Sequence, residues 1–394
     1  MATIDVASAR ADTPGCNTVV HLNNAGAALP PQPVLDAVIG HLELEATSGG
    51  YEAQGQASEQ AERFYTAVAE LIGAQADEIA YVENATRAWD MAFYAIPFRP
   101  GERILTTTSE YPANGIAFQQ AARRHGVRVD VVPDDSHGQI SIDALKSELA
   151  AGDVRVVAVN HVPTHNGLVN PAQEIGELCR AAGALYLLDA CQSVGQLAVN
   201  VDEIGCDLLS ATGRKFLRGP RGTGFLYARR DVIETLEPPF LDHHAATWTA
   251  PDTYEIREDA KRFETWERFV AGQIGLGVAA GYAAALGPHA IEERVTWLAN
   301  RLREQLSAVP GVTVRDRGAR RCGIVTFSME GHDPDDVVRL LLEHGINVSW
   351  SRVSALQFDP AAVPIVRASV HYYNTEDELD RVVDTLARIR PDTR

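Results

Sequence analysis

The sequence predicts an α/β protein in which helices cover both faces of a mainly parallel, seven-stranded sheet and a smaller α+β part follows at the C-terminal end. From about residue 76, short apolar runs alternate with amphipathic stretches, an order typical of βαβ units. After about residue 251 this alternation gives way to a long helix followed by short strands and helices. Neither a G-x-G-x-x-G motif after the first strand nor a P-loop occurs, which argues against a Rossmann or P-loop nucleotide site.

The expected strands of the large sheet are rich in Val, Ile, Leu and Tyr. They cover residues 78–82, 103–107, 127–132, 154–160, 185–188, 208–211 and 224–227. Amphipathic stretches between them predict helices over 86–95, 114–125, 140–151 and 171–182. Because each strand is followed by a helix along most of this region, we expect parallel pairing.

The C-terminal part begins with a helix rich in Gly and Ala, expected over residues 266–287. An amphipathic helix over 289–307, strands over 313–315, 323–329 and 366–371, and helices over 334–344 and 376–389 complete it. We therefore expect a large domain over residues 20–260. Residues 1–19 and 261–394 would form a small domain that includes the inter-domain helix.

The composition of the chain argues against several classes of function. The chain carries 35 Lys and Arg against 53 Asp and Glu, a net charge of −18, which opposes binding to nucleic acids and to anionic membrane surfaces. The five cysteines are scattered without a CxxC pair, so we expect neither a metal site nor a disulfide framework. Residues 1–18 lack the apolar core of a signal peptide, and no apolar run is long enough to cross a bilayer. We expect a cytoplasmic protein.

Asp189 is the first candidate for chemistry, because it ends a strictly apolar strand. A carboxylate there is costly unless a cation meets it, and ligands bind at this edge of a doubly wound sheet. The alternative is that Asp189 caps the following helix.

A second stretch, residues 210–224, places Gly, Lys and Arg directly after the next strand. Lys215 is a candidate covalent amine, and Thr212 and Arg214 are candidates to hold a phosphate; the alternative is an exposed basic loop. Both stretches together point to pyridoxal phosphate, which requires a lysine, an acid opposite its ring nitrogen and phosphate donors.

With Gln192 added, this combination resembles the class V aminotransferase group of fold-type I pyridoxal-phosphate enzymes. The group includes cysteine desulfurases, cystine C–S lyases and isopenicillin N epimerase. The resemblance runs from about residue 21 to residue 389 and implies a fold-type I transferase fold and a homodimer.

The resemblance also implies roles for the cofactor-binding residues. Lys215 would bind the cofactor covalently, Asp189 would pair with the ring nitrogen, and Gln192 would bind the phenolic oxygen. Thr212 and Arg214 would bind the phosphate, together with a turn that opens a helix, formed by Ala85, Thr86 and Arg87. Tyr111 stands where desulfurases carry a His that stacks on the ring, and we count it among the catalytic residues. Thr164 takes the place of an Asn near the cofactor oxygen.

For the substrate, the resemblance implies that Arg367 binds the α-carboxylate. Arg352 is the second candidate, and the N-terminal motif at residues 23–28 places Asn24 and Ala27 at the carboxylate site. His243, His244 and Trp248 lie in an expected loop that would be a substrate lid or a dimer contact. Thr265 or Trp266 would reach across the dimer.

One departure from the desulfurases favours a different reaction. Their nucleophilic cysteine precedes the carboxylate-binding arginine, whereas residues 349–355 contain no cysteine and place Ser354 near that position. A serine cannot accept sulfur as a persulfide. We therefore expect an enzyme that acts at Cα of an L-amino acid, with a β-eliminating C–S lyase acting on a cysteine-derived substrate as first choice. The alternatives are an epimerase resembling isopenicillin N epimerase, a class V aminotransferase, and a non-catalytic cofactor-binding protein.

Overall fold

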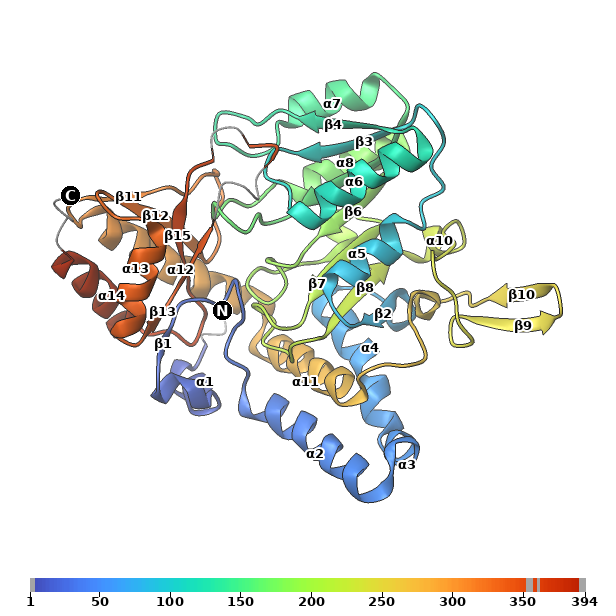
Figure 1. Cartoon of the computed structure of the whole chain (residues 1–394), viewed down its shortest axis with the longest axis horizontal. Coiled ribbons are helices and arrows are strands. Elements are labelled where there is room, and N and C mark those ends of the chain that lie inside the picture. The colour runs from blue at the N-terminus through green and yellow to red at the C-terminus, as the bar shows by residue number, and fades with distance from the viewer. Residues whose placement is uncertain (1–3, 352–356, 360–361, 390–394) are drawn as a thin grey trace.

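The computed structural model describes residues 4–351, 357–359 and 362–389. Its large sheet has seven strands in the order β2-β8-β7-β6-β5-β3-β4 (Figure 1). The strands are β2 (Ile79–Val82), β3 (Arg103–Thr107), β4 (Arg128–Val132), β5 (Val154–Asn160), β6 (Leu185–Asp189), β7 (Leu208–Thr212) and β8 (Gly224–Ala228). The strands β7, β6, β5, β3 and β4 pair in parallel, and β8 is antiparallel to both its neighbours. The predicted mainly parallel sheet is confirmed.

Both faces of this sheet are buried. Along β5, Val157 and Val159 pack into one apolar core, and Val156 and Ala158 pack into the other, as the twofold alternation of a strand requires. The helices of this region are α5 (Ala85–Phe93), α6 (Pro112–His125), α7 (Ile142–Ala150), α8 (Ala172–Ala182), α9 (Val201–Ile204) and α10 (Arg230–Ile233). Short 3-10 helices cover Pro14–Asn17, Ala76–Glu78 and Ala260–Phe263.

The N-terminal segment holds four helices that were not among the predicted elements. They are α1 (Val6–Ala11), α2 (Gln32–Ser48), α3 (Gly50–Gln56) and α4 (Ser58–Ile72). The helix α4 packs along α11 (Val270–Leu286) (Figure 1). A Cβ on Gly277 of α11 would lie 2.9 Å from the Cα of Phe64. The small residues of α11 therefore serve close packing between these helices.

The Gly- and Ala-rich helix begins later than predicted, at Val270 instead of residue 266. Polar contacts hold the preceding residues outside the helix. The Trp266 N–H donates to Asp242 at 2.7 Å, and Arg268 Nε donates to Gln273 at 2.8 Å.

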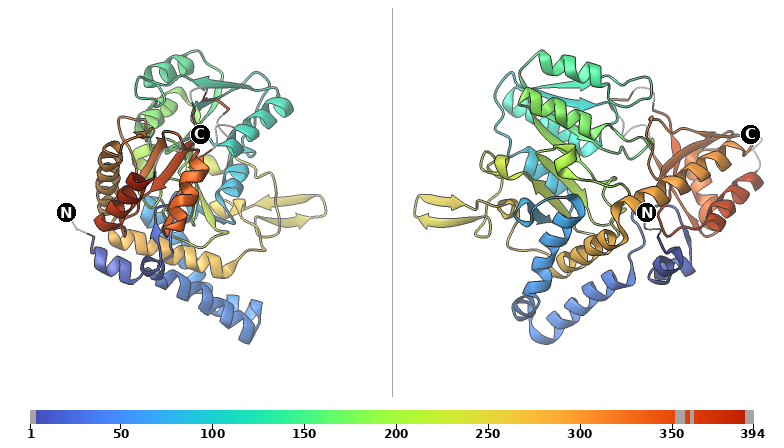
Figure 2. Two further views of the ribbon diagram at one scale, coloured as in Figure 1. Left: turned by 60° about the vertical axis from the view of Figure 1, so that its left-hand side comes forward. Right: turned by 180° about the vertical axis from the view of Figure 1, so that it is seen from behind.

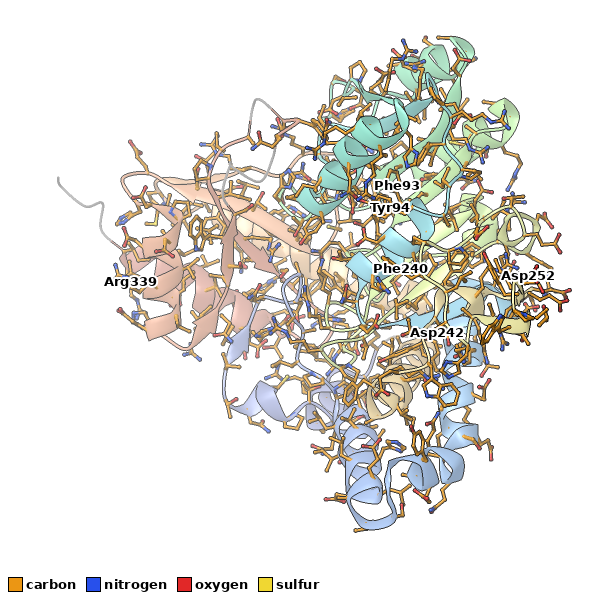
Figure 3. The ribbon with its side chains drawn as sticks, turned by 45° about the vertical axis from the view of Figure 1, so that its right-hand side comes forward. Phe93, Tyr94, Phe240, Asp242, Asp252 and Arg339 are labelled. Carbon is orange, nitrogen blue, oxygen red and sulfur yellow. The ribbon has the colours of Figure 1, made fainter. Side chains whose placement is uncertain are left out.

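The connection before this helix forms a hairpin that the prediction treated as a loop. Strands β9 (Ala246–Ala250) and β10 (Thr253–Ile256) pair antiparallel and project from the body of the molecule (Figure 1). Figure 3 labels Phe240 and Asp242 on the approach to this hairpin and Asp252 in its turn. Most of the hairpin is exposed on both faces, so its sequence lacks the apolar alternation that marks a half-buried strand.

The C-terminal part is the predicted α+β unit and lies beside the large sheet (Figure 2). Its antiparallel sheet has the order β11-β12-β15-β14. The elements are β11 (Val312–Val314), β12 (Ile324–Met329), β14 (Ser349–Ser351) and β15 (Ile365–Ser369), with α12 (Pro288–Ser307), α13 (Pro334–Glu343) and α14 (Glu376–Arg388). The N-terminal β1 (Val20–His21) pairs in parallel with β13 (Ile346–Asn347). The domain boundaries expected near residues 20 and 260 stay a prediction.

Within the described ranges, no single helix is long and apolar enough to span a membrane. The pair α11 and α12, bent by 80° where they meet, passes that test jointly by length and composition alone.

Candidate active site

A cavity of about 300 Å³ lies at the carboxyl ends of β5, β6 and β7. The parallel register aligns Asn160, Asp189 and Ser210 across these three strands, so side chains that follow them converge at one edge. The predicted cofactor residues that line this cavity are Ala85, Thr86, Tyr111, Thr164, Asp189, Gln192, Thr212, Arg214 and Lys215. A larger groove of about 590 Å³ between α2, α4 and α11 contains neither Lys215 nor Asp189.

Lys215 follows β7 and is almost fully buried. Its Nζ lies 6.0 Å from the centroid of the Tyr111 ring. Burial lowers the pKa of the Lys215 amine, and the nearby charges of Arg214 and Arg367 add to this effect, whereas Cys191 and Asp189 oppose it. A lowered pKa leaves more of the amine neutral, which is the nucleophilic form that attacks an aldehyde.

Asp189 is the last residue of β6 and its carboxylate is held from two sides. Its Oδ1 accepts a hydrogen bond from the Cys191 N–H at 2.9 Å, and its Oδ2 accepts one from Asn114 Nδ2 at 3.1 Å. The alternative that Asp189 caps the next α-helix is not realised, because that helix, α9, begins only at Val201.

Gln192, Thr164 and Arg367 form a connected chain beside the cavity. Gln192 Nε2 donates to Thr164 Oγ1 at 2.9 Å, and Arg367 Nη1 donates to the same oxygen at 2.5 Å. Burial lowers the pKa of Arg367 to about 10, and the charge of Arg214 contributes. No acidic side chain forms an ion pair with Arg367 among the residues that the structure describes. A buried cation without an anionic partner is costly, so this position suits a carboxylate ligand.

The N-terminus of α5 faces the cavity from another side. The Asn84 side chain caps this helix by accepting a hydrogen bond from the Arg87 N–H at 2.9 Å. The first N–H groups of an α-helix have no partner inside the helix and favour an anion such as phosphate. A Cβ on Gly224 of β8 would lie 2.7 Å from the Ala211 carbonyl oxygen and 2.9 Å from the Asn84 carbonyl carbon. Glycine therefore allows β8 to lie close to the start of α5.

Several predicted residues lie outside the lining of the cavity. The Arg87 guanidinium lies 4.9 Å from the centroid of the Phe240 ring. Asn24 is fully buried and donates to the Ser369 carbonyl at 2.7 Å, which ties the N-terminal segment to β15. Ala27 accepts a hydrogen bond from the His21 ring at 2.8 Å. Arg352 and Ser354 lie outside the described residues.

The loop that carries His243 and His244 contacts the buried carboxylate of Glu264. His244 Nε2 lies 3.0 Å from Glu264 Oε2, and the His243 ring centroid lies 4.9 Å from that of Trp266. None of these four side chains lines the cavity. The roles suggested for this loop and for Trp248 stay predictions.

Glu110 is one of the lining residues that were not predicted from the sequence. It lines the cavity and is almost fully buried. Burial raises the pKa of its carboxyl group to about 7, although hydrogen bonds from Thr106 and the Tyr111 N–H lower it. The available signal was its position, since Glu110 lies shortly after the end of the buried strand β3, as Lys215 does after β7.

Comparison with known proteins agrees with this geometry. The family model described as Aminotransferase class-V matches residues 20–382. The chain belongs to this family. It is 32% identical to a probable cysteine desulfurase of Methanothermobacter thermautotrophicus over 96% of this chain and 97% of that protein. Among solved structures, it is similar to the apo cysteine desulfurase of Thermococcus onnurineus NA1, with 28% identity, a TM-score of 0.90 and 98% of each chain covered. A complex of a cystine C–S lyase with its product cysteine persulfide has the same fold, with 24% identity, a TM-score of 0.86, and 96% of this chain and 100% of that chain covered.

The class-V family and the pocket together confirm the cofactor expected from the sequence, pyridoxal phosphate. The pocket supplies an amine, an acid and a helix N-terminus on its different sides. In addition, the Oε1 atom of Gln192 is buried and has no hydrogen-bond partner. Buried polar atoms are normally paired, so this atom fits a polar group of a bound cofactor. The predicted fold-type I fold is confirmed as well.

Proposed function

We propose that this class-V enzyme is a C–S lyase that eliminates the sulfur group of a cysteine-derived L-amino acid without forming a persulfide on a cysteine of its own. Relatives named cysteine desulfurase support a substrate of the cysteine type. The observation that favours this reaction over that of a desulfurase is the raised pKa of the five cysteine thiols.

Burial raises the pKa of each of the five thiols, which makes all of them poor nucleophiles. Cys191 lines the cavity, but its pKa is raised well above the ordinary value. The other four are Cys16, Cys179, Cys206 and Cys322. Only a thiolate attacks a substrate sulfur effectively, so no cysteine of this chain is suited to receive one.

Side chains that line the pocket, together with Arg367 beside it, would have separate roles in such a reaction. Bound pyridoxal phosphate supplies an electron-withdrawing ring that acidifies the Cα proton of an attached amino acid. Asp189 would keep the ring nitrogen protonated, and Lys215 Nζ would hold the cofactor and, once the substrate amine has replaced it, take the Cα proton. Arg367 would orient the substrate by its carboxylate, and Tyr111 would cover one face of the ring.

The overall elimination balances without an external oxidant or reductant. The Cβ–S bond breaks, its electron pair leaves with sulfur, and the sulfur group is released as a free thiol. The remaining three-carbon unit takes up water and leaves as pyruvate and ammonia.

Replacing all five cysteines by Ser or Ala tests the proposal. Because no thiol takes part, we expect kcat/KM for an S-substituted cysteine to stay within about threefold of wild type. Single variants at Cys191 and Cys322 serve as controls, and thermal melting reports whether each variant is folded. A folded, cofactor-loaded Cys191 or Cys322 variant that is inactive would restore the desulfurase interpretation.

The epimerase and aminotransferase alternatives share removal of the Cα proton with this reaction and differ from it only in the next step. An epimerase returns the proton to the opposite face of Cα, and an aminotransferase transfers the amino group to the cofactor. The homodimer and the cytoplasmic location stay predictions.

A further inference from the structure

Two carboxylates meet at one amide beside the cofactor pocket. Asn114 Nδ2 donates to Glu110 Oε1 at 3.0 Å and to Asp189 Oδ2 at 3.1 Å. Asn114 lies in the first turn of α6, Glu110 follows β3 and Asp189 ends β6. The bridge therefore connects three elements that are far apart in the sequence.

Glu110 also holds the residue that faces the Lys215 amine. Its Oε1 accepts hydrogen bonds from the Tyr111 N–H at 2.6 Å and from Asn160 Nδ2 at 2.7 Å, and its Oε2 accepts one from Thr106 Oγ1 at 2.7 Å. The Tyr111 ring is exposed, and the bond to Glu110 restrains the backbone from which this ring projects.

The hydrogen-bond donors around the buried carboxylate of Glu110 carry no charge. All four hydrogen-bond donors are neutral, and no Lys, Arg or His forms an ion pair with Glu110 in the part of the chain that the structure describes. The charged group facing Glu110 from another element is Asp189 of β6, whose charge raises the pKa of Glu110 further. Burial without a cation is the main reason why this pKa rises to about 7.

We propose that Glu110 is a positioning residue of the cofactor site: it fixes Asp189 through the amide of Asn114 and fixes Tyr111 through its backbone N–H. This inference rests on the proposed function, because both residues it positions act on the bound cofactor. The ionised form of Glu110 accepts all four hydrogen bonds. A proton on Oε2 can be donated to the Thr106 hydroxyl, so the neutral form keeps the three bonds at Oε1.

That geometry separates two substitutions. In Glu110→Gln the amide oxygen can replace Oε1 and the amide nitrogen can donate to Thr106, so the positions of Asp189 and Tyr111 are kept while the charge is removed. In Glu110→Leu all four donors lose Glu110 as an acceptor, and only Asn114 and Asn160 keep a second one, Asp189 and the Ser109 carbonyl. The leucine variant therefore tests the positioning, and the glutamine variant should rescue it.

Binding of pyridoxal phosphate to apoenzyme, followed by visible absorbance, is the main measurement. We expect Glu110→Leu and Asn114→Ala each to raise the dissociation constant about tenfold or more, since hydrogen bonds to charged groups are lost. Glu110→Gln should stay near the wild-type value. In the double variant Glu110→Leu, Asn114→Ala, the loss of cofactor-binding free energy should be well below the sum of the two single losses. The reason is that both substitutions act through the same bridge. Asp134→Asn is the matched control, because Asp134 is bound by Thr108 at 2.7 Å but lies outside the pocket lining.

The glutamine variant has a second, independent signature. Because the pKa of folded Glu110 is about 7, above its ordinary value of 4.5, wild-type stability from this group is present at low pH and is lost as the pH rises to 7 and above. The melting temperature of the Glu110→Gln apoenzyme relative to wild type should therefore increase between pH 5 and pH 8.

The outcomes separate the inference from the function on which it rests. If wild-type protein binds no pyridoxal phosphate, the proposed function fails. If wild type binds it and folded Glu110→Leu binds equally tightly, the positioning role is overturned. If Glu110→Leu folds, a double variant in which the two effects add fully also overturns it. Should Glu110→Leu not fold, tight cofactor binding by folded Asn114→Ala overturns it instead.

Discussion

Lys215→Ala protein will bind no pyridoxal phosphate covalently and will lose nearly all turnover. Wild-type protein treated with cofactor and then borohydride should retain the cofactor on Lys215, detectable by a shifted peptide mass. The loss of turnover should be at least about 10²–10⁴-fold, the contribution of a positioned general base alone. The physical basis is the buried amine, whose lowered pKa favours attack on the aldehyde.

Lys261→Ala is the matched control for this experiment. Lys261 pairs with Glu62 at 2.9 Å outside the pocket, so its removal should leave the borohydride-stable adduct and the turnover unchanged. Full turnover in Lys215→Ala, together with a reducible adduct on another lysine, would show that Lys215 has been assigned wrongly.

Arg367→Ala should weaken substrate binding strongly while the covalent cofactor stays in place. Removing one partner of a buried charge pair typically costs about 2–5 kcal/mol, which corresponds to roughly 30-fold to several-thousand-fold in affinity. The measurement is the absorbance change on titration with an L-amino acid, compared with an analogue that lacks the α-carboxylate. Wild type should discriminate between the two ligands, and the variant should not.

Arg317→Ala is the control for the loss of a nearby arginine, because Arg317 pairs with Asp359 at 3.1 Å. An Arg367→Ala enzyme with wild-type affinity for the amino acid would remove Arg367 from the carboxylate site. Arg352, the second arginine predicted for this role, would then be substituted in the same way.

The sequence predicted the sheet well because its central strands are buried on both faces. The run at residues 154–160 contains four valines, and the structure assigns β5 to Val154–Asn160. Among the missed N-terminal helices, α4 does have an amphipathic pattern, with Ala61, Phe64, Tyr65, Val68, Ala69 and Ile72 buried on one face, whereas α2 does not. In α2 the buried side chains are Val34 and His41, and the exposed ones include Ile39 and Leu42, so no simple stripe marks the helix.

The cofactor side of the site could be predicted because Asp189 and Lys215 follow buried strands, a position that depends on local sequence only. Glu110 also lies shortly after a buried strand, β3, but its role could not be assigned from that position alone. Its setting depends on Asn114 from α6, Asn160 from β5 and Thr106 from β3, and no spacing in the sequence reveals that these side chains meet. The contacts of Asn24 with Ser369 likewise join opposite ends of the chain.

The most direct test of the proposed reaction is the identity of its carbon product. Purified holoenzyme is incubated with an S-substituted L-cysteine, and the mixture is analysed for pyruvate, ammonia, free thiol, alanine and the D-enantiomer of the substrate. We predict equal amounts of pyruvate, ammonia and thiol, because the sulfur leaves with the electron pair of the Cβ–S bond and no cysteine of the enzyme intervenes. Alanine as the main product, with sulfur bound to a cysteine of the enzyme, would contradict the account and identify a desulfurase.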